Sequence, residues 1–210
     1  MRNLLFLLFK KPLQILKDLA CLKSIKATVN QDAPITFQTW FIQKVLGINR
    51  GVYWPVHHSS IVSYPNRVQI GIETNPGLNP GCYIHGVNRI YIGDYTQFGP
   101  NVGLISGNHD LYDFRKQSES KPIKIGKHCW VGMNVVVMPG VELGDFTIVG
   151  AGSIVTKSFP EGKCVIVGNP AKKNKDLDSS KCIYFKTDNP YIGYMPEEEF
   201  EKFKNSKLDV

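Results

Sequence analysis

The chain has 210 residues, 42% of them hydrophobic and 20% charged, and its formal net charge is +7. This length allows one well-sized hydrophobic core with terminal additions, and the composition is ordinary for a globular protein. Because no nucleic-acid motif appears, the positive charge favours a solvated basic face, or attraction of a phosphorylated cofactor, over nucleic acid as partner. The five cysteines include no CxxC pair, which argues against a disulfide framework or zinc knuckle. We expect most of them to be small buried residues in a reducing compartment.

Residues 1–27 predict a basic amphipathic helix that Pro12 kinks or restarts. The apolar run Leu4–Phe9 is too short for a signal peptide and is followed by lysines, and no segment approaches the ~20 apolar residues of a membrane span. We therefore expect a cytoplasmic protein. The first helix is expected to pack on the protein body or a neighbouring subunit, and contact with a membrane surface is the less favoured alternative.

A second helix is predicted over Ile35–Leu46, ended by Gly47. Short β-rich pieces follow it, beginning with an irregular coil and a loop or distorted turn at Asn75–Gly81. The residues that mark this first coil are Val56, Ile61, Val68 and Ile70.

A strict six-residue repeat runs from Ile125 to Pro160. An aliphatic residue opens every block, and glycine follows it in four of the six blocks. A period of six fits neither a helix nor a freestanding strand. It fits a coil of three short strands, in which aliphatic side chains stack inward and glycine turns a corner, so it predicts an all-β, left-handed parallel β-helix. The block-opening residues are Ile125, Val131, Val137, Leu143, Val149 and Val155, preceded in the same phase by Ile92, Phe98 and Leu104.

The repeat is interrupted between Leu104 and Ile125, where its phase slips by three residues. The intervening GNHDLYDFRKQSESKP is polar and charged, which predicts a loop at 107–121 that projects from the coil. Loops carried on a rigid scaffold are common places for binding and catalysis.

After the repeat, one more strand is predicted at Cys164–Val167, and PEEEFEKFK predicts a short surface helix. We find no functional signal in this C-terminal part. The expected organisation is an N-terminal helical segment (1–50), a β-helix domain (51–175) and a C-terminal tail (176–210).

The run IKIGKHCWVGMNVVVMPGVELGDFTIVGAGSIVTKSFPEGKCVIVGNPAKK, with GNHD upstream, resembles the hexapeptide-repeat acetyltransferases, above all the galactoside, maltose and colanic-acid types. The match covers roughly residues 68–175. The resemblance implies transfer of an acetyl group from acetyl-CoA to a hydroxyl of a sugar or glycan precursor. It also implies a homotrimer with active sites between subunits, and no metal.

Acetyl transfer to a hydroxyl needs a group that removes the hydroxyl proton, and a histidine with a pKa near ~6.5 suits this task. In the resembling family a loop histidine is that general base, and His109 in GNHD matches it. Asp110 is expected to orient the imidazole or hold the loop, although related enzymes often have proline there. Asn79 matches the active-site asparagine of galactoside enzymes and would stabilise the oxyanion; a turn residue is the alternative.

No residue stands out as a covalent nucleophile. Ser106 precedes His109 by three residues, which is weak support for a dyad, so direct attack in a ternary complex is the simpler mechanism. His85 either projects into the same cleft or has a structural role.

The donor is expected to bind along the C-terminal coils. The resemblance places a tryptophan beside the active site, pantetheine against the backbone of the coils, and a Thr-Lys pair after the last regular coil. Further lysines suit the phosphates of the donor, with a solvated surface as the alternative for each. The residues assigned to the donor are Trp130, Met133, Ala151, Thr156, Lys157, Lys172 and Lys175.

Three alternatives stay open. A γ-class carbonic anhydrase shares the fold but needs a histidine triad around zinc, and here Phe114 stands five residues after His109. A non-catalytic β-helix assembly subunit would not need its histidine or lysines. An N-acetyltransferase acting on an amino or nucleotide sugar, or on a xenobiotic, would differ only in the acceptor.

Overall fold

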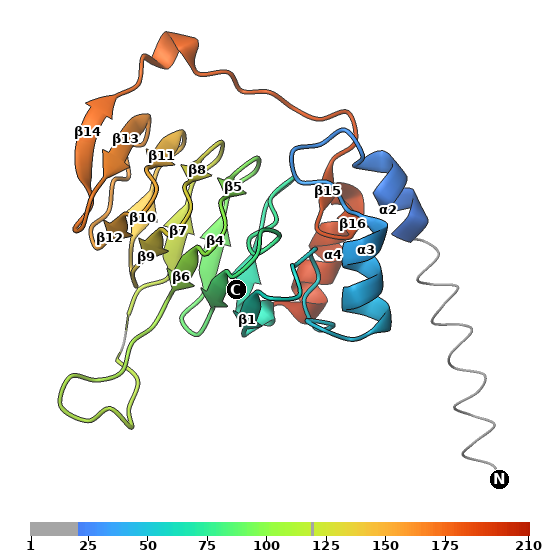
Figure 1. The fold of residues 1–210 in the computed structure, drawn as a ribbon, viewed down its shortest axis with the longest axis horizontal. Coiled ribbons are helices and arrows are strands. Elements are labelled where there is room, and N and C mark those ends of the chain that lie inside the picture. Colours follow the sequence, from blue (N-terminus) through green and yellow to red (C-terminus); the bar gives the residue numbers. More distant parts are fainter. Residues whose placement is uncertain (1–20, 119) are drawn as a thin grey trace.

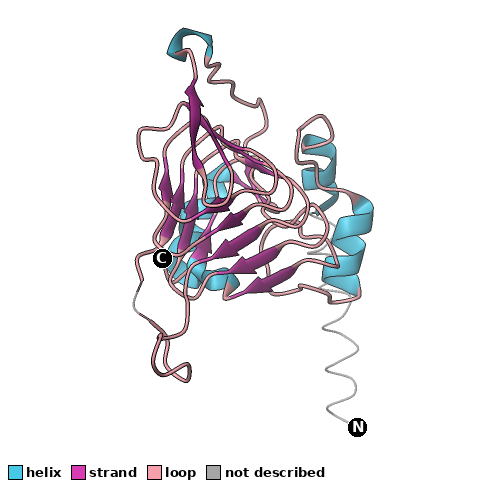
Figure 2. Cartoon of the chain, turned by 60° about the vertical axis from the view of Figure 1, so that its left-hand side comes forward, coloured by secondary structure: helices cyan, strands magenta, loops and turns pink. Residues whose placement is uncertain are grey.

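The computed structural model describes residues 21–118 and 120–210. The strands wind into a parallel β-helix, and the helices gather at the end where the coil begins (Figure 1). Figure 2 shows the strands wound about one axis, with the loop after β6 projecting below them. The all-β class and the β-helix predicted from the six-residue period are confirmed.

Within the described residues, the coil consists of three sheets, here named A, B and C, and the chain passes through them in that order in each turn. Sheet A contains β1 (Ile61–Ser63), β3 (Tyr83–His85), β6 (Gly103–Ile105), β9 (Val136–Val137) and β12 (Ile154–Val155). Sheet B contains β2 (Val68–Gln69), β4 (Ile90–Ile92), β7 (Ile123–Ile125) and β10 (Glu142–Leu143). Sheet C contains β5 (Gln97–Phe98), β8 (Trp130–Val131), β11 (Thr147–Val149), β13 (Cys164–Val167) and the antiparallel β14 (Lys172–Asp176). We name the prism edges where the sheets meet AB, BC and CA.

The core is a set of aliphatic columns that run along the axis. On sheet A, Leu104 lies in register with Val137, and Val137 with Val155, and each of these side chains is fully buried. Burying an aliphatic side chain of this size stabilises a fold by about 1.5–3 kcal/mol. The six-residue period therefore reports which side chains enter the core.

Of the residues that mark the first coil, Val56, Val68 and Ile70 are buried, whereas Ile61 is 58% exposed. The register pairs Val62 with the buried Ile84, so Val62 takes the inward position. A shift of one residue exchanges the two faces of a strand.

The predicted second helix is confirmed as α3 (Phe37–Trp40) followed by one π-helical turn, η1 (Phe41–Val45). It starts slightly later than expected because Thr36 caps it, accepting a hydrogen bond from the Thr39 amide at 3.1 Å. The predicted first helix lies largely outside the described residues, of which α2 (Cys21–Ala27) is the first element. None of the described helices is long and apolar enough to cross a membrane.

The C-terminal tail returns along the coil to its starting end (Figure 1). The Thr187 amide donates to the Tyr95 hydroxyl at 3.2 Å, and Phe200 packs its ring 6.0 Å from that of Tyr53. The predicted strand Cys164–Val167 and the surface helix are confirmed. Besides the short 3-10 turn η2 (Pro65–Arg67) near the start of the coil, the remaining elements are η3 (Ser179–Lys181), β15 (Tyr191–Ile192), β16 (Met195–Pro196) and α4 (Glu197–Lys207).

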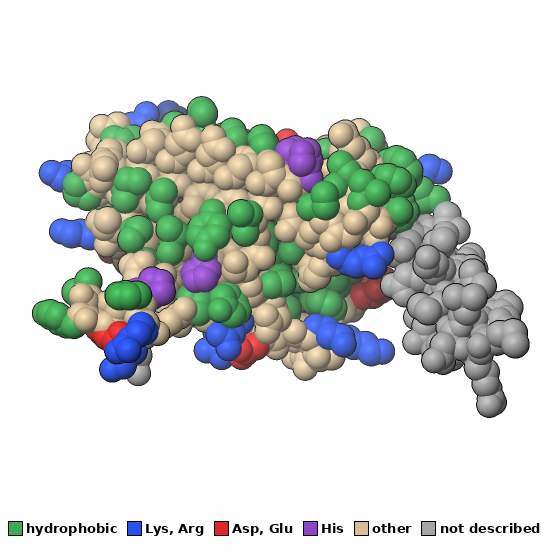
Figure 3. Space-filling view, turned by 60° about the horizontal axis from the view of Figure 1, so that its bottom comes forward, with side chains coloured by type: hydrophobic (Ala, Val, Ile, Leu, Met, Phe, Trp, Pro, Cys, Tyr) green, Lys and Arg blue, Asp and Glu red, His purple; other side chains and the backbone are tan. Residues whose placement is uncertain are grey.

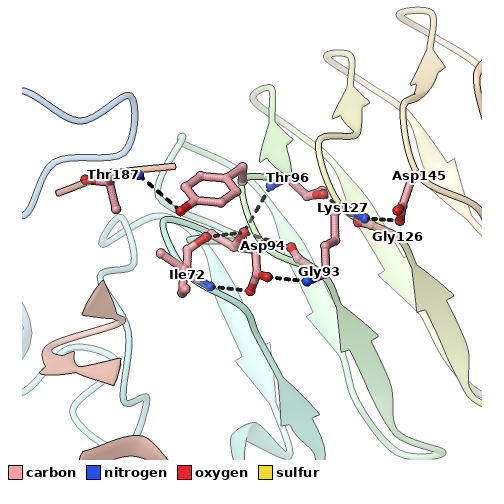
Figure 4. A network of polar contacts seen from close by, with 10 residues as sticks. Ile72, Gly93, Asp94, Thr96, Gly126, Lys127, Asp145 and Thr187 are labelled. Carbon is pink, nitrogen blue, oxygen red and sulfur yellow. Dashed lines mark hydrogen bonds and ion pairs between the residues drawn. The ribbon is translucent and has the colours of Figure 1, made fainter. Parts of the chain in front are cut away.

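A polar network ties successive coils together along the BC edge (Figure 4). Asp94 accepts a hydrogen bond from the Ile72 amide at 3.0 Å and pairs with the Lys127 ammonium at 2.7 Å. The Lys127 amide in turn donates to Asp145 at 2.7 Å, so four consecutive coils are linked. This partly exposed ladder fixes the spacing of the corners over which the C-terminal tail passes.

Candidate functional site

The projecting loop leaves the coil at the AB edge, directly after β6. Ser106, which is buried, anchors its root: the hydroxyl donates to the His85 carbonyl at 2.8 Å and accepts from the Asn88 amide at 2.9 Å. From the other side of the loop, Ser120 donates to the Ser106 carbonyl at 2.9 Å. The Ser106 hydroxyl is therefore occupied by backbone groups, as a structural residue would be.

The predicted base, His109, lies on the first limb of the loop, paired by an antiparallel bridge with Gln117 on the returning limb. Ser118 strengthens this pairing, because its amide donates to the Asn108 carbonyl at 2.9 Å. The imidazole is solvent-exposed. The described part of the loop thus forms a hairpin that holds a histidine outside the core.

Asp110 braces the tip of this hairpin. Its carboxylate oxygen Oδ1 accepts hydrogen bonds from the amides of Tyr112 and Asp113, both at 2.9 Å. These bonds, that from Tyr112 foremost, hold the pKa of the Asp110 carboxyl below its usual value. Of the two roles expected for Asp110, these contacts favour holding the loop.

His85 is the predicted site residue that the structure brings towards His109. It lies at the end of β3, on the outer face of sheet A and next to the loop root. Burial lowers the pKa of His85, and the charge of His109 lowers it further. His85 therefore tends to stay neutral beside His109.

Asn79 lies at the CA edge, at the opposite end of the sheet A strands. The side-chain amide nitrogen of Asn79 donates to the Phe98 carbonyl at 2.6 Å. The backbone carbonyl of Asn79 accepts from the Ser60 hydroxyl at 2.9 Å. One amide hydrogen remains for another acceptor. Much of the hydrogen-bonding capacity of Asn79 is used to close a coil corner.

The CA edge also carries the residues assigned to pantetheine. Met133, 45% exposed, and Ala151 stand at successive corners, which are joined by a hydrogen bond from the Gly152 amide to the Met133 carbonyl at 2.9 Å. A Cβ at Gly132 would come within 2.8 Å of the Ala151 nitrogen, so this stacking requires glycine. Trp130, 51% exposed, precedes this corner on the outer face of sheet C.

Thr156 and Lys157 follow β12 and therefore lie at the AB edge, as the loop does. A corner-to-corner passage along sheet A takes about five residues, or roughly 16 Å of extended chain. The predicted site residues are thus divided between two edges of one protomer: His109, Thr156 and Lys157 on AB, and Asn79, Met133 and Ala151 on CA. One protomer does not bring the two groups together.

Lys172 and Lys175 lie on β14, an exposed antiparallel strand that the sequence did not predict. Lys172 pairs with Val167, close to the CA edge, and Lys175 pairs with Val165 in the middle of sheet C. The segment KKNKD carries no hydrophobic period that would predict a strand. Both ammonium groups are solvent-exposed at the end of the coil where donor phosphates were expected.

Two hollows of the described surface lie away from these residues. One of about 360 Å³ covers sheet B beside Tyr91 and Lys124, and one of about 300 Å³ lies between Lys44 and Phe203. Neither is lined by a predicted site residue. Among the described residues, no group of three His, Cys, Asp or Glu side chains is arranged to hold a metal ion.

Comparison with known proteins gives the following relationships. Residues 122–157 match the family model described as bacterial transferase hexapeptide (six repeats). Galactoside O-acetyltransferase of Escherichia coli is 37% identical over 145 residues, which cover 67% of this chain and 68% of that protein. The putative colanic acid biosynthesis acetyltransferase WcaF of Escherichia coli is 32% identical over 150 residues, which cover 70% of this chain and 81% of that protein.

Solved structures show the same relationship. A galactoside acetyltransferase in complex with coenzyme A superposes with a TM-score of 0.58 at 26% identity, over 87% of this chain and 90% of that chain. A maltose O-acetyltransferase from Clostridium difficile 630 gives a TM-score of 0.56 at 26% identity, over 80% of this chain and 89% of that chain.

Proposed function

The chain belongs to the hexapeptide-repeat acetyltransferase family, and on this basis we propose that it transfers an acetyl group from acetyl-CoA to a hydroxyl of a sugar or glycan precursor. The observation that carries the proposal is the alignment with acetyltransferases named for galactoside and colanic acid over two thirds of the chain or more. A solved relative that holds coenzyme A supports the choice of donor. Such a donor also suits the cytoplasmic location expected from the sequence.

In the proposed reaction His109 is the general base. Its imidazole removes the hydroxyl proton while the acceptor oxygen attacks the thioester carbonyl, and it returns the proton to the departing CoA thiolate. The bonding of the Ser106 hydroxyl to backbone groups supports direct transfer without an acyl-enzyme. Much of the rate would come from holding the two substrates in line.

We assign the complete site to the space between two protomers of a homotrimer. The division of the predicted residues between edges AB and CA supports this, because a cyclic assembly can place the AB edge of one copy against the CA edge of the next. The loop tip supports it too: Leu111, Tyr112 and Phe114 are 92%, 98% and 77% exposed. Large apolar side chains that protrude in this way are typical of contact surfaces.

Acetyl-CoA would lie along this interface. Pantetheine would pass the corners of Met133 and Ala151 on the CA edge of one protomer, with Trp130 beside it. Thr156 and Lys157 would come from the AB edge of the neighbouring protomer. The exposed ammonium groups of Lys172 and Lys175 are placed to attract phosphates.

The experiment is thermal unfolding with and without acetyl-CoA, followed by turnover of a His109→Ala variant. Donor at a hundred times its dissociation constant should stabilise the fold by about 2.7 kcal/mol. His109→Ala should keep this shift but lose about 10²–10⁴-fold in turnover. The control is His58→Ala, which removes an exposed histidine elsewhere. No shift at millimolar acetyl-CoA would refute the donor, and near-normal turnover of His109→Ala would remove this residue from the mechanism.

A further inference from the structure

An exposed aromatic cluster lies on the outer face of sheet A, beside the loop that carries His109. The rings of Tyr83 and His85 are nearly parallel, at 9° and with centroids 5.7 Å apart, and Tyr64 meets His85 edge-on at 5.7 Å. Tyr64 and Tyr83 are 44% and 40% exposed. Figure 3 views this side of the molecule and shows histidine side chains reaching the surface beside the projecting loop.

The cluster is held in place by its surroundings. The Arg67 guanidinium lies 5.7 Å from the centre of the Tyr64 ring, and it is itself fixed by Asp209 at 2.8 Å and the Val87 carbonyl at 2.8 Å. The Tyr83 hydroxyl lies 3.4 Å from Nδ1 of His85. The aromatic faces are therefore oriented before any ligand arrives, which lowers the entropy lost on binding.

This arrangement has the chemistry of a sugar-binding surface. Ligand sites combine aromatic or apolar walls with a few polar groups that fix orientation. The C–H face of a pyranose ring packs on an aromatic face, while its hydroxyls can meet the Tyr83 hydroxyl and the His85 imidazole. The His85 carbonyl binds the Ser106 hydroxyl at the root of the loop that carries His109, so the cluster adjoins the loop that holds the proposed base.

We propose that Tyr64, Tyr83 and His85 form an acceptor platform, on which a pyranose ring stacks so that one hydroxyl is directed towards His109. This inference rests on the proposed acetyl transfer and adds the residues that choose the acceptor. The platform favours a ring-shaped acceptor over an acyclic alcohol, because only a ring presents a flat C–H face to the aromatic side chains.

The test uses maltose and p-nitrophenyl β-galactoside as probe acceptors and follows the CoA thiol released from acetyl-CoA. Tyr83→Ala and Tyr64→Ala remove the rings, and Tyr83→Phe keeps the ring without the hydroxyl. Tyr91→Ala is the matched control, because Tyr91 is the outward tyrosine of β4 on sheet B. We expect the acceptor KM to rise about tenfold in the alanine variants. In Tyr83→Phe the KM should rise less than in Tyr83→Ala, because the ring remains and only the hydroxyl contact is lost. In Tyr91→Ala it should stay close to wild type, with the donor-induced thermal shift unchanged throughout.

Each contrary outcome identifies what fails. An unchanged acceptor KM in both alanine variants, with donor binding intact, would overturn the platform. So would a change of oligomeric state in Tyr83→Ala, measured by light scattering, since the cluster would then be a contact between copies. A wild-type protein that binds acetyl-CoA but acetylates neither pyranoside would show that the ligand class is wrong. Failure of the wild-type protein to bind acetyl-CoA would instead count against the proposed function itself.

Discussion

At the scale of single residues, the loop shows how a carboxylate next to a proposed base can act through the backbone alone. Asp110 follows His109 directly, yet its Oδ1 is bonded to the amides of Tyr112 and Asp113. A backbone brace of this kind positions the imidazole without touching it. The alternative, a carboxylate that stabilises the imidazolium, depends on the charge of Asp110.

The two roles of Asp110 predict different effects of substituting this residue. Asp110→Ala removes both hydrogen bonds, so we expect turnover to fall about tenfold through misplacement of His109, with acetyl-CoA binding unchanged. Asp110→Asn keeps an acceptor oxygen without the charge and should restore most of the turnover. Steady-state kinetics across pH 5–9 provides the measurement. If Asp110→Asn were as slow as Asp110→Ala and its pH profile had shifted, the carboxylate charge would act on the imidazole.

The sequence predicts single residues well where they belong to a local pattern. The six-residue phase places Leu104 and Val137 in the core, and the GNHD motif singles out His109. The sequence does not predict that the Asn79 side-chain amide donates to the Phe98 carbonyl, since these groups meet only after the coil has closed. Tyr83 was missed for a similar reason. The alternation in YIH marks it as outward-facing, but Tyr64, which completes the aromatic cluster, comes from the preceding coil.

At the scale of elements, the BC edge carries an aromatic column. The His128 ring is stacked between Tyr95 and Phe146, at centroid distances of 5.0 and 4.9 Å, and Phe185 of the returning tail meets it edge-on at 5.0 Å. Nδ1 of His128 is buried without a hydrogen-bond partner among the described residues. Burial lowers the pKa of His128, and nearby carboxylates, chiefly Asp145, oppose this only in part.

The column predicts a loss of stability in mild acid. Because the folded pKa of His128 lies below its unfolded value near ~6.5, the unfolded chain takes up the proton first as pH falls. The contribution of His128 is therefore complete above about pH 6.5 and declines as pH falls towards the folded pKa. His57 and His85, whose pKa values burial also lowers, should add to this slope.

The variant His128→Phe tests directly whether the aromatic column causes the acid sensitivity. Phe146 occupies the equivalent corner of the next coil with a similar positive φ, so phenylalanine fits the backbone there and keeps the stack. Melting temperature measured from pH 7.5 to 5.0 should fall less steeply in His128→Phe than in the wild-type protein. His58→Phe, at an exposed position, should reproduce the wild-type slope. Equal slopes for all three proteins would exclude His128 as a source of acid sensitivity.

Elements outside the repeat were predicted less completely. The helix Glu197–Lys207 was expected because its charges and phenylalanines form a local pattern, but its packing on Tyr53 was not. The strand Lys172–Asp176 was missed because every residue in it is exposed, and its pairing with β13 is set by the edge left open at the end of sheet C. Sequence periodicity indicates which residues are buried, and no residue of this strand is buried.

At the scale of the whole molecule, several exposed apolar surfaces lack a partner within the described protomer. The loop tip is one, and the outer side of the N-terminal helical segment is another, where hydrophobic side chains gather at the right of Figure 3. Both suit contacts between copies, as expected for a homotrimer. The exposed residues of the helical segment are Phe37, Phe41, Val45, Leu46 and Ile48.

The division of the site between two edges makes a prediction that separates a shared site from a complete one. His109→Ala damages the AB edge, and Ala151→Trp obstructs the CA edge at an exposed corner. Each variant alone should be nearly inactive. When the two are unfolded, mixed and refolded together, about one quarter of the interfaces combine an intact AB edge with an intact CA edge, so about that fraction of wild-type activity should return.

The decisive control pairs two variants of the same edge. His109→Ala and Lys157→Glu both lie on AB, so every interface of their mixed assemblies receives one damaged AB edge, and no activity should return. Recovery with Ala151→Trp but not with Lys157→Glu would require sites that span two chains. Recovery in neither mixture, from assemblies shown by light scattering to contain both variants, would mean that each protomer holds its own site. The separation of the two edges would then have to be bridged by movement of the loop towards CA.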